Sequence, residues 1–149
     1  MNAVKLPSIL SVEDNDEDFA SLCLALKAAG FANPVQRCAN SRAAAAALSS
    51  GRGCPALSDA ALVLLDLNMP GVDGRELLEL FRAREPRLPV IVLSTSSHPD
   101  DIEFCYDAGA NGYLVKPLEF DRWEQMMTTV ANYWLRTVVA PPLHANDAQ

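Results

Sequence analysis

The sequence predicts an α/β domain built on a doubly wound, five-stranded parallel sheet. Five short apolar runs are typical of strands, and each precedes a segment that favours a helix. The strongest runs lack polar alternation, as expected for strands buried on both faces by covering helices. At 149 residues the chain is long enough for one domain, so we expect a single domain over 1–149 with its core at about 6–138.

The first predicted strand–helix pair occupies the start of the chain. Residues 6–12 are apolar and include β-branched side chains, which favours a strand. After it, Phe19, Leu22 and Leu26 recur at helical spacing, and Gly30 is placed to end the helix. The acids at the start of this helix are favoured there by the helix dipole.

A second, weaker strand is predicted over 33–38, followed by an alanine-rich helix over 41–50. Asn40 or Ser41 is the candidate N-cap of this helix. Residues 51–60 contain Gly, Pro and Ser and predict a loop.

The third pair begins with the strongest strand, 61–68, a continuous run of Leu and Val that reaches Asp66. A turn follows, and then a helix over 75–85 that Asp73 would cap and Pro86 would stop.

The last two pairs complete the pattern. Residues 88–97 form an apolar strand that ends in hydroxyl side chains, and a poor helix is predicted over 99–108 after His98, a candidate loop or N-cap residue. The final strand is 113–115, and the last helix is predicted to run to about Val138.

Polar residues follow four of the predicted strands at their carboxyl ends. Glu13 and Asp14 follow the first strand, while Asp66, Ser94 and Lys116 end the third, fourth and fifth. Parallel sheets bind ligands at this edge. Three carboxylates there call for a cation, and Mg²⁺ prefers such oxygen ligands. Beside it, Asp66 could act as a nucleophile toward phosphorus, with Lys116 and Ser94 contacting phosphate oxygens.

Four stretches of the chain resemble the receiver domain of two-component response regulators: ILSVEDN, LVLLDLNMPGVDGRELL, PVIVLSTSS and GANGYLVKP. The resemblance covers about residues 6–138 and implies the flavodoxin-like (βα)5 receiver fold. It implies that Asp66 is the phosphoacceptor and that Mg²⁺ is held by Glu13, Asp14, Asp66 and the backbone carbonyl of Asn68.

The same resemblance implies three further roles. Lys116 corresponds to the lysine that pairs with phosphate, Ser94 to the switch hydroxyl, and Tyr113 to the aromatic that turns inward on activation. It also implies a cis peptide bond between Lys116 and Pro117. The protein would then be a stoichiometric phosphoacceptor rather than an enzyme, phosphorylated by a partner histidine kinase.

A finer resemblance is to single-domain regulators that serve bacterial and cyanobacterial phytochromes. It rests on LLDLNMPGVDGRELL, on the loop 51–60 and on the ending YWLRTVVAPP. It implies a bacteriophytochrome as the kinase. Since a short tail follows the last helix, we expect the signal to pass by protein contact, onward phosphotransfer or draining of phosphate from the kinase.

Two other functions remain as alternatives. A phosphorylation-independent scaffold with the receiver fold would not need the intact acidic pair, Asp66, Ser94 and Lys116. A small phosphatase of the haloacid dehalogenase type also uses an aspartyl nucleophile, but it needs an acid two residues later, where Asn68 stands.

The amino-acid composition argues against some classes of binding partner. The formal net charge of −7 argues against nucleic acids and anionic membranes, which bind clustered Lys and Arg. No apolar stretch approaches the roughly 20 residues that span a bilayer. The four scattered cysteines favour reduced thiols, and we expect a cytoplasmic protein.

The last helix carries a broader apolar sector than one buried face requires, with Tyr133 and Trp134 near its end. It predicts either an extended core or a homodimer through the face formed by the helix 99–108, the strand 113–115 and the last helix, with the C-terminal segment. The tail 139–149 is expected to be flexible.

Overall fold

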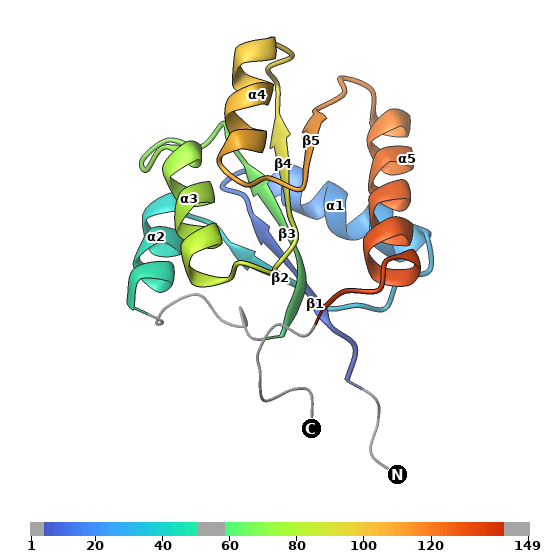
Figure 1. Cartoon of the computed structure of the whole chain (residues 1–149). Helices are drawn as coiled ribbons and strands as arrows, with labels where there is room; N and C mark the ends of the chain where they lie inside the picture. Colours follow the sequence, from blue (N-terminus) through green and yellow to red (C-terminus); the bar gives the residue numbers. More distant parts are fainter. Residues whose placement is uncertain (1–4, 51–58, 142–149) are drawn as a thin grey trace.

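The computed structural model describes residues 5–50 and 59–141, and Figure 1 shows their arrangement. The strands are β1 (Ser8–Val12), β2 (Val35–Cys38), β3 (Ala60–Asp66), β4 (Val90–Ser94) and β5 (Gly112–Val115). The α-helices are α1 (Asp16–Ala28), α2 (Ser41–Ser50), α3 (Gly74–Arg84), α4 (Pro99–Asp107) and α5 (Phe120–Ala131), and a π-helical turn, η1 (Asn132–Thr137), follows α5. The predicted alternation of strands and helices is confirmed.

The strands form one parallel sheet in the order β2-β1-β3-β4-β5. Helices α1 and α5 cover one face, and α2, α3 and α4 cover the other (Figure 1). This is the doubly wound sheet that the sequence predicts. The strand order reverses between β1 and β3, so the loops that follow these strands diverge and leave room for a ligand at the carboxyl edge.

Two sets of buried side chains fix the helices on the sheet. Leu77 and Phe81 of α3 belong to the set on one face, and Leu26 of α1 and Met127 of α5 belong to the other. The side chains of β1 and β4 are buried throughout, as are those of β3 apart from Ala61. A site at the ends of these strands is therefore supported by buried, closely packed backbone.

Side-chain caps set the starts of the helices. Asp73 and His98 cap α3 and α4, as predicted. Asn40 rather than Ser41 caps α2, because Asn40 Oδ1 accepts the N–H of Ala43 at 3.0 Å. The Ser41 hydroxyl instead bonds to the loop after β3.

The last helical segment ends where the sequence predicts, at about Val138, but its type changes on the way. The α-helix α5 ends at Ala131, and the π-helical turn η1 continues to Thr137 with Val138 as its C-cap. In the last turn of α5, the hydroxyls of Thr128 and Thr129 donate to carbonyls four residues earlier, at 2.8 and 2.9 Å. Such bonds compete with the regular backbone ladder and often accompany a bend, and here they lie just before the change of helix type.

The broad apolar sector of this helix is largely core. Met127 and Ala131 are buried, and Trp123, Met126 and Trp134 pack partly buried against the set of side chains between α1, α5 and the sheet. Much of the sector therefore belongs to an extended core, which is the first of the two alternatives that the sequence predicts.

The expected cis peptide bond is wrong: the described peptide bonds are trans, including Lys116–Pro117. The trans form is favoured by about 0.5–1 kcal/mol even before proline, so the resemblance to a motif does not impose the cis form. Three other expectations, on residues 51–58 of the predicted loop, on Cys54 and on residues 142–149 of the tail, lie outside the described residues. Within the described part, no helix is long and apolar enough to cross a membrane.

Candidate functional site

The carboxyl ends of β1, β3, β4 and β5 bring the predicted residues to one edge of the sheet. Val12 of β1 pairs with Leu65 of β3, which places Glu13 beside Asp66 at the next position. Asp66 in turn pairs with Leu93, so Ser94 lies one position further along β4. Glu13, Asp66 and Ser94 are only 5%, 3% and 3% exposed, which is rare for such polar residues.

Three carboxylates form an acidic cluster in this edge. Glu13, Asp14 and Asp66 each offer one oxygen, and these oxygens lie within 4.8 Å of one another. Glu13 and Asp66 are buried, whereas Asp14 is exposed. Closely spaced carboxylate oxygens with an open side suit a hard cation such as Mg²⁺, which keeps several waters beside one or two carboxylates. The residues present fit the predicted metal.

Lys116 supplies the positive charge of the site. Its Nζ lies 3.0 Å from Asp66 Oδ2, and it lies 3.9 Å from Glu13 Oε2 and 3.8 Å from Asp18 Oδ2. Its backbone N–H donates to the carbonyl of Ser94 at 2.7 Å, which fixes the start of the loop after β5. The ammonium is thus aimed at the carboxylate that sequence reasoning assigns as nucleophile.

The electrostatics of the cluster keep Glu13 protonated at neutral pH. Burial, the hydrogen bond to Asp66 and the negative charge of that residue together raise the pKa of Glu13 to about 8. The N–H of Asn15, which donates to Glu13 Oε1 at 3.1 Å, and the ammonium of Lys116 act to lower this pKa. A cation that binds here must displace this proton.

Asn68 connects the Asp66 loop to the loop after β4. Its N–H donates to Asp66 Oδ1 at 2.8 Å, and its side-chain oxygen accepts the N–H of Thr95 at 2.9 Å. The expected role of its backbone carbonyl as a metal ligand stays a prediction. The side-chain bond to Thr95 was not predicted from the sequence.

Ser96 joins the two residues expected to switch. The Ser94 hydroxyl accepts the N–H of Ser96 at 3.1 Å, and the half-buried Tyr113 donates its hydroxyl to the Ser96 carbonyl at 2.8 Å. Ser96 Oγ also donates to Asp101 at 2.6 Å, and Asp101 accepts from Arg75 at 2.8 Å. The hydroxyl residues at the end of the fourth predicted strand could have indicated a role for Ser96. No pattern in the sequence indicated one for Arg75 or Asp101.

A comparison with protein families gives one match, the response regulator receiver domain, over residues 9–128. The chain belongs to this family. It is a receiver of two-component signalling, as its motifs indicate.

Curated relatives include a probable methanogenesis regulatory protein, FilR2 of Methanothrix harundinacea, which is 35% identical over 133 residues, or 85% of this chain and 83% of FilR2. Response regulator Rcp1 of Synechocystis is 39% identical over 82 residues, which are 54% of this chain and 56% of Rcp1. The match to the transcriptional regulatory protein MalR of Bacillus subtilis spans 28% of that protein.

Solved structures give a closer likeness over the whole fold. The phosphorylated cyanobacterial phytochrome response regulator RcpA is 33% identical with a TM-score of 0.82, covering 91% of this chain and 99% of RcpA. The Mn²⁺-bound form of Rcp1 is 32% identical with a TM-score of 0.80, at the same coverage of 91% and 99%. The receiver domain of the sensor kinase PA1611 of Pseudomonas aeruginosa, 26% identical with a TM-score of 0.63 over 87% of this chain and 98% of its own, has magnesium in its active-site cleft. Divalent metal therefore occupies this site in relatives, and this chain carries a matching acidic cluster.

Proposed function

We propose that the protein accepts a phosphoryl group on Asp66 from a phosphohistidine of a partner histidine kinase, with Mg²⁺ bound beside it. The observation that carries this proposal is the placement of Asp66. Its buried carboxylate ends β3, lies 3.0 Å from Lys116 and shares an acidic cluster with Glu13 and Asp14. A carboxylate so placed can attack phosphorus while neighbouring groups neutralise the charge of the phosphoryl oxygens.

Asp66, Asn68 and Lys116 each have a separate role in the phosphoryl transfer. A carboxylate oxygen of Asp66 forms the new O–P bond while the N–P bond to the kinase breaks and its electron pair stays on the imidazole. The N–H of Asn68 holds Asp66 Oδ1 and so fixes the orientation of the carboxylate. The ammonium of Lys116 moves from the free carboxylate to a phosphoryl oxygen.

Mg²⁺, held by Glu13, Asp14, Asp66 and the carbonyl oxygen of Asn68, would supply further positive charge to the phosphoryl oxygens. Oxygen donors are the ligands that this ion prefers, which supports the assignment.

The phosphorylated site acts as a switch through Ser94. Its hydroxyl accepts the N–H of Ser96, so the hydroxyl proton can be donated to the phosphoryl group. Movement of Ser94 toward this group shifts Ser96, and Tyr113 loses or changes its bond to the Ser96 carbonyl. The face formed by α4, β5 and α5 then changes shape and passes the signal by contact. In this role the protein is a stoichiometric phosphoacceptor rather than an enzyme that turns over a separate substrate.

The proposed kinase partner is a bacteriophytochrome. The likeness to RcpA, to Rcp1 and to RPA3017, a response regulator in red light signalling of R. palustris that is 32% identical with a TM-score of 0.79, supports this choice. Phosphotransfer from a purified bacteriophytochrome kinase should be faster than transfer from a histidine kinase that lacks a chromophore. Equal rates from both kinases would contradict this partner while leaving the phosphoacceptor role intact.

The proposed chemistry is tested by intact-mass spectrometry after incubation with acetyl phosphate and Mg²⁺. The wild type should gain a single phosphoryl adduct that EDTA prevents, and Asp66→Asn should gain none, because its amide is not a nucleophile. Asp107→Asn, a change at an exposed acid of α4, is the matched control and should behave like the wild type.

Two outcomes would contradict the proposal. An equal adduct on the Asp66→Asn protein would place the acceptor elsewhere. Absence of an adduct on the wild type, with acetyl phosphate and with a phosphorylated kinase alike, would favour the phosphorylation-independent scaffold.

A further inference from the structure

Arg37 of β2 reaches across to the loop that joins β1 to α1. Its Nε donates to the backbone carbonyl of Glu13 at 2.9 Å, and its Nη1 donates to Asp16 Oδ1 at 2.7 Å. The guanidinium also stands over the ring of Phe19, 5.1 Å from its centroid. One side chain thus holds both ends of the short loop that carries Glu13 and Asp14.

The shape of the guanidinium suits this task. It presents several N–H donors in one rigid plane, so it can contact a carbonyl and a carboxylate at once while one face rests on an aromatic ring. A lysine ammonium carries the same charge but cannot reproduce this set of contacts. Arg37 has a side chain only 21% exposed, so its position is well defined by its neighbours.

The loop itself has few contacts that hold it against the sheet. Asp14, Asn15 and Asp16 are exposed. Within the loop, the N–H of Asn15 donates to Glu13 Oε1 and the Asn15 side chain caps α1. These bonds are local. The loop is tied to β2 by the N–H of Glu13, which donates to the carbonyl of Cys38 at 3.0 Å, and by the side-chain contacts of Arg37, which reach as far as Asp16.

The charge of Arg37 and its contacts act on a bound cation in opposite directions. Its positive charge repels Mg²⁺, while its contacts keep the ligand carboxylates in place. Four further acids follow Glu13 between residues 14 and 18, and their like charges oppose a compact loop, which a fixed counter-charge favours. Whether a substitution of Arg37 strengthens or weakens Mg²⁺ binding therefore shows whether its charge or its contacts have the larger effect.

We propose that Arg37 is a positioning residue for the metal site, holding the loop that carries Glu13 and Asp14 in the geometry that binds Mg²⁺. This inference rests on the proposed function of the same site. Partners of ligand residues typically change metal affinity by about 10- to 100-fold when they are replaced, and Arg37 contacts the main chain of a ligand residue directly.

The experiment is a Mg²⁺ titration of the full chain, followed by the backbone amide NMR shifts of residues 13–18. Arg37→Lys keeps the charge, Arg37→Gln removes it, and Phe19→Leu removes the ring beneath the guanidinium without changing any charge. The matched control is Arg136→Gln, because Arg136 also donates to a backbone carbonyl, that of Gly30, and stands over an aromatic ring, but at the opposite edge of the sheet.

Both Arg37 variants should bind Mg²⁺ about tenfold more weakly than the wild type, Phe19→Leu about threefold more weakly, and Arg136→Gln equally well. Tighter binding by Arg37→Gln with unchanged binding by Arg37→Lys would overturn the inference, because it would show an effect of charge alone. Unchanged binding in both would also overturn it. If an Arg37 variant does not fold, the Phe19→Leu protein decides instead. Its weaker binding of Mg²⁺ would support the inference, and unchanged binding would overturn it.

The outcomes separate this inference from the proposed function. A wild type that shows no Mg²⁺-dependent shifts at residues 13–18 would remove the metal site on which both depend. A wild type that binds Mg²⁺ and accepts phosphate, with Arg37 variants that match it, would remove only the role of Arg37.

Discussion

At the scale of single residues, the positive charge of Lys116 offsets the free-energy cost of burying the carboxylate of Asp66. Two opposite charges separated by 3.0 Å attract by about 5 kcal/mol at an effective dielectric constant of about 20. Burying each ion costs several kcal/mol, so the pair roughly breaks even. Separating the pair would leave a buried charge unpaired, so the ammonium of Lys116 can leave Asp66 only where a phosphoryl group supplies a new negative partner.

The pKa of Glu13 predicts how metal binding depends on pH. Because this pKa is raised to about 8, the carboxyl carries a proton at neutral pH that a bound cation must displace. The apparent affinity for Mg²⁺ should fall as the pH is lowered from about 9 to about 6, by up to about tenfold per unit. Isothermal titration calorimetry across this range measures the change, with Glu13→Gln as the control that cannot titrate.

The same shift has a consequence for stability. The folded state binds this proton more tightly than the unfolded chain, whose carboxyl titrates at its ordinary value of 4.5. The metal-free protein should therefore lose stability as the pH rises from the ordinary value of a glutamate to about 8. Urea unfolding of the wild type in EDTA should show this loss, and a profile that matches that of Glu13→Gln would contradict the assignment.

At the scale of elements, α4 is connected to the site by a chain of polar contacts. Arg75 of α3 donates to Asp101 of α4 and stands 4.3 Å from the ring centroid of Phe104. The hydrogen bond from Ser96 and then the charge of Arg75 lower the pKa of Asp101, which stays ionised at neutral pH. Ser96, Asp101 and Arg75 thus link the loop after β4 and the first turn of α4 into one hydrogen-bonded unit.

Breaking this unit should loosen α4 without unfolding the protein. Asp101→Asn keeps the shape of the side chain but removes the charge that Arg75 and Ser96 bind. We expect faster amide hydrogen exchange across Pro99–Asp107, with little change in the global free energy of unfolding, because the ion pair of Arg75 and Asp101 is partly exposed to solvent.

Asp100→Asn is the control for this change, since Asp100 is an exposed neighbour in the same turn. If its exchange rates rise as much as those of Asp101→Asn, the effect belongs to the helix terminus rather than to the contacts of Asp101.

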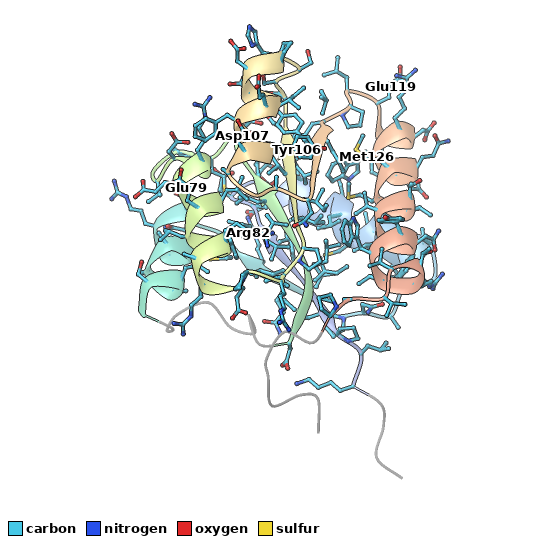
Figure 2. All side chains as sticks on the ribbon, viewed as in Figure 1. Glu79, Arg82, Tyr106, Asp107, Glu119 and Met126 are labelled. Atoms are coloured by element: carbon cyan, nitrogen blue, oxygen red, sulfur yellow. The ribbon has the colours of Figure 1, made fainter. Side chains whose placement is uncertain are left out.

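At the scale of the whole molecule, the face that would pass on the signal is formed by three elements. Tyr106 lies on α4 and Met126 on α5, on the two sides of β5 (Figure 2). Tyr106 and Val115 are exposed, whereas Met126 packs partly into the core. An exposed aromatic side chain on a face that would change shape on phosphorylation suits the predicted contact between two copies of the chain.

Homodimerisation through this face can be tested by one change of charge. In Tyr106→Lys, an interface related by two-fold symmetry would place two like charges close together, so the dimer should weaken by about tenfold or more. Light scattering of the phosphorylated protein over a range of concentrations measures the dissociation constant.

Leu24→Lys, on the exposed side of α1, is the matched control and should dimerise normally. Dissociation of the Leu24→Lys protein instead would move the interface to α1, and a wholly monomeric wild type would contradict the homodimer predicted from the sequence.

The sequence by itself determined the order of the elements, the parallel sheet and the positions of Glu13, Asp66, Ser94 and Lys116 at its edge. These follow from local patterns, because apolar runs without alternation imply strands buried on both faces, and parallel strands bring their carboxyl ends together. Helix starts such as Asp73 were predictable for the same reason, since a cap bonds to backbone within its own turn.

The tertiary structure alone decided the contacts between residues distant in sequence. Arg37 contacts the carbonyl of Glu13 from another strand, and Arg75 contacts Asp101 from another helix. Such bonds depend on where whole elements pack, and no spacing in the sequence encodes them. The raised pKa of Glu13 belongs here too, because burial and the approach of Asp66 exist only once the sheet has brought both carboxyls to one edge.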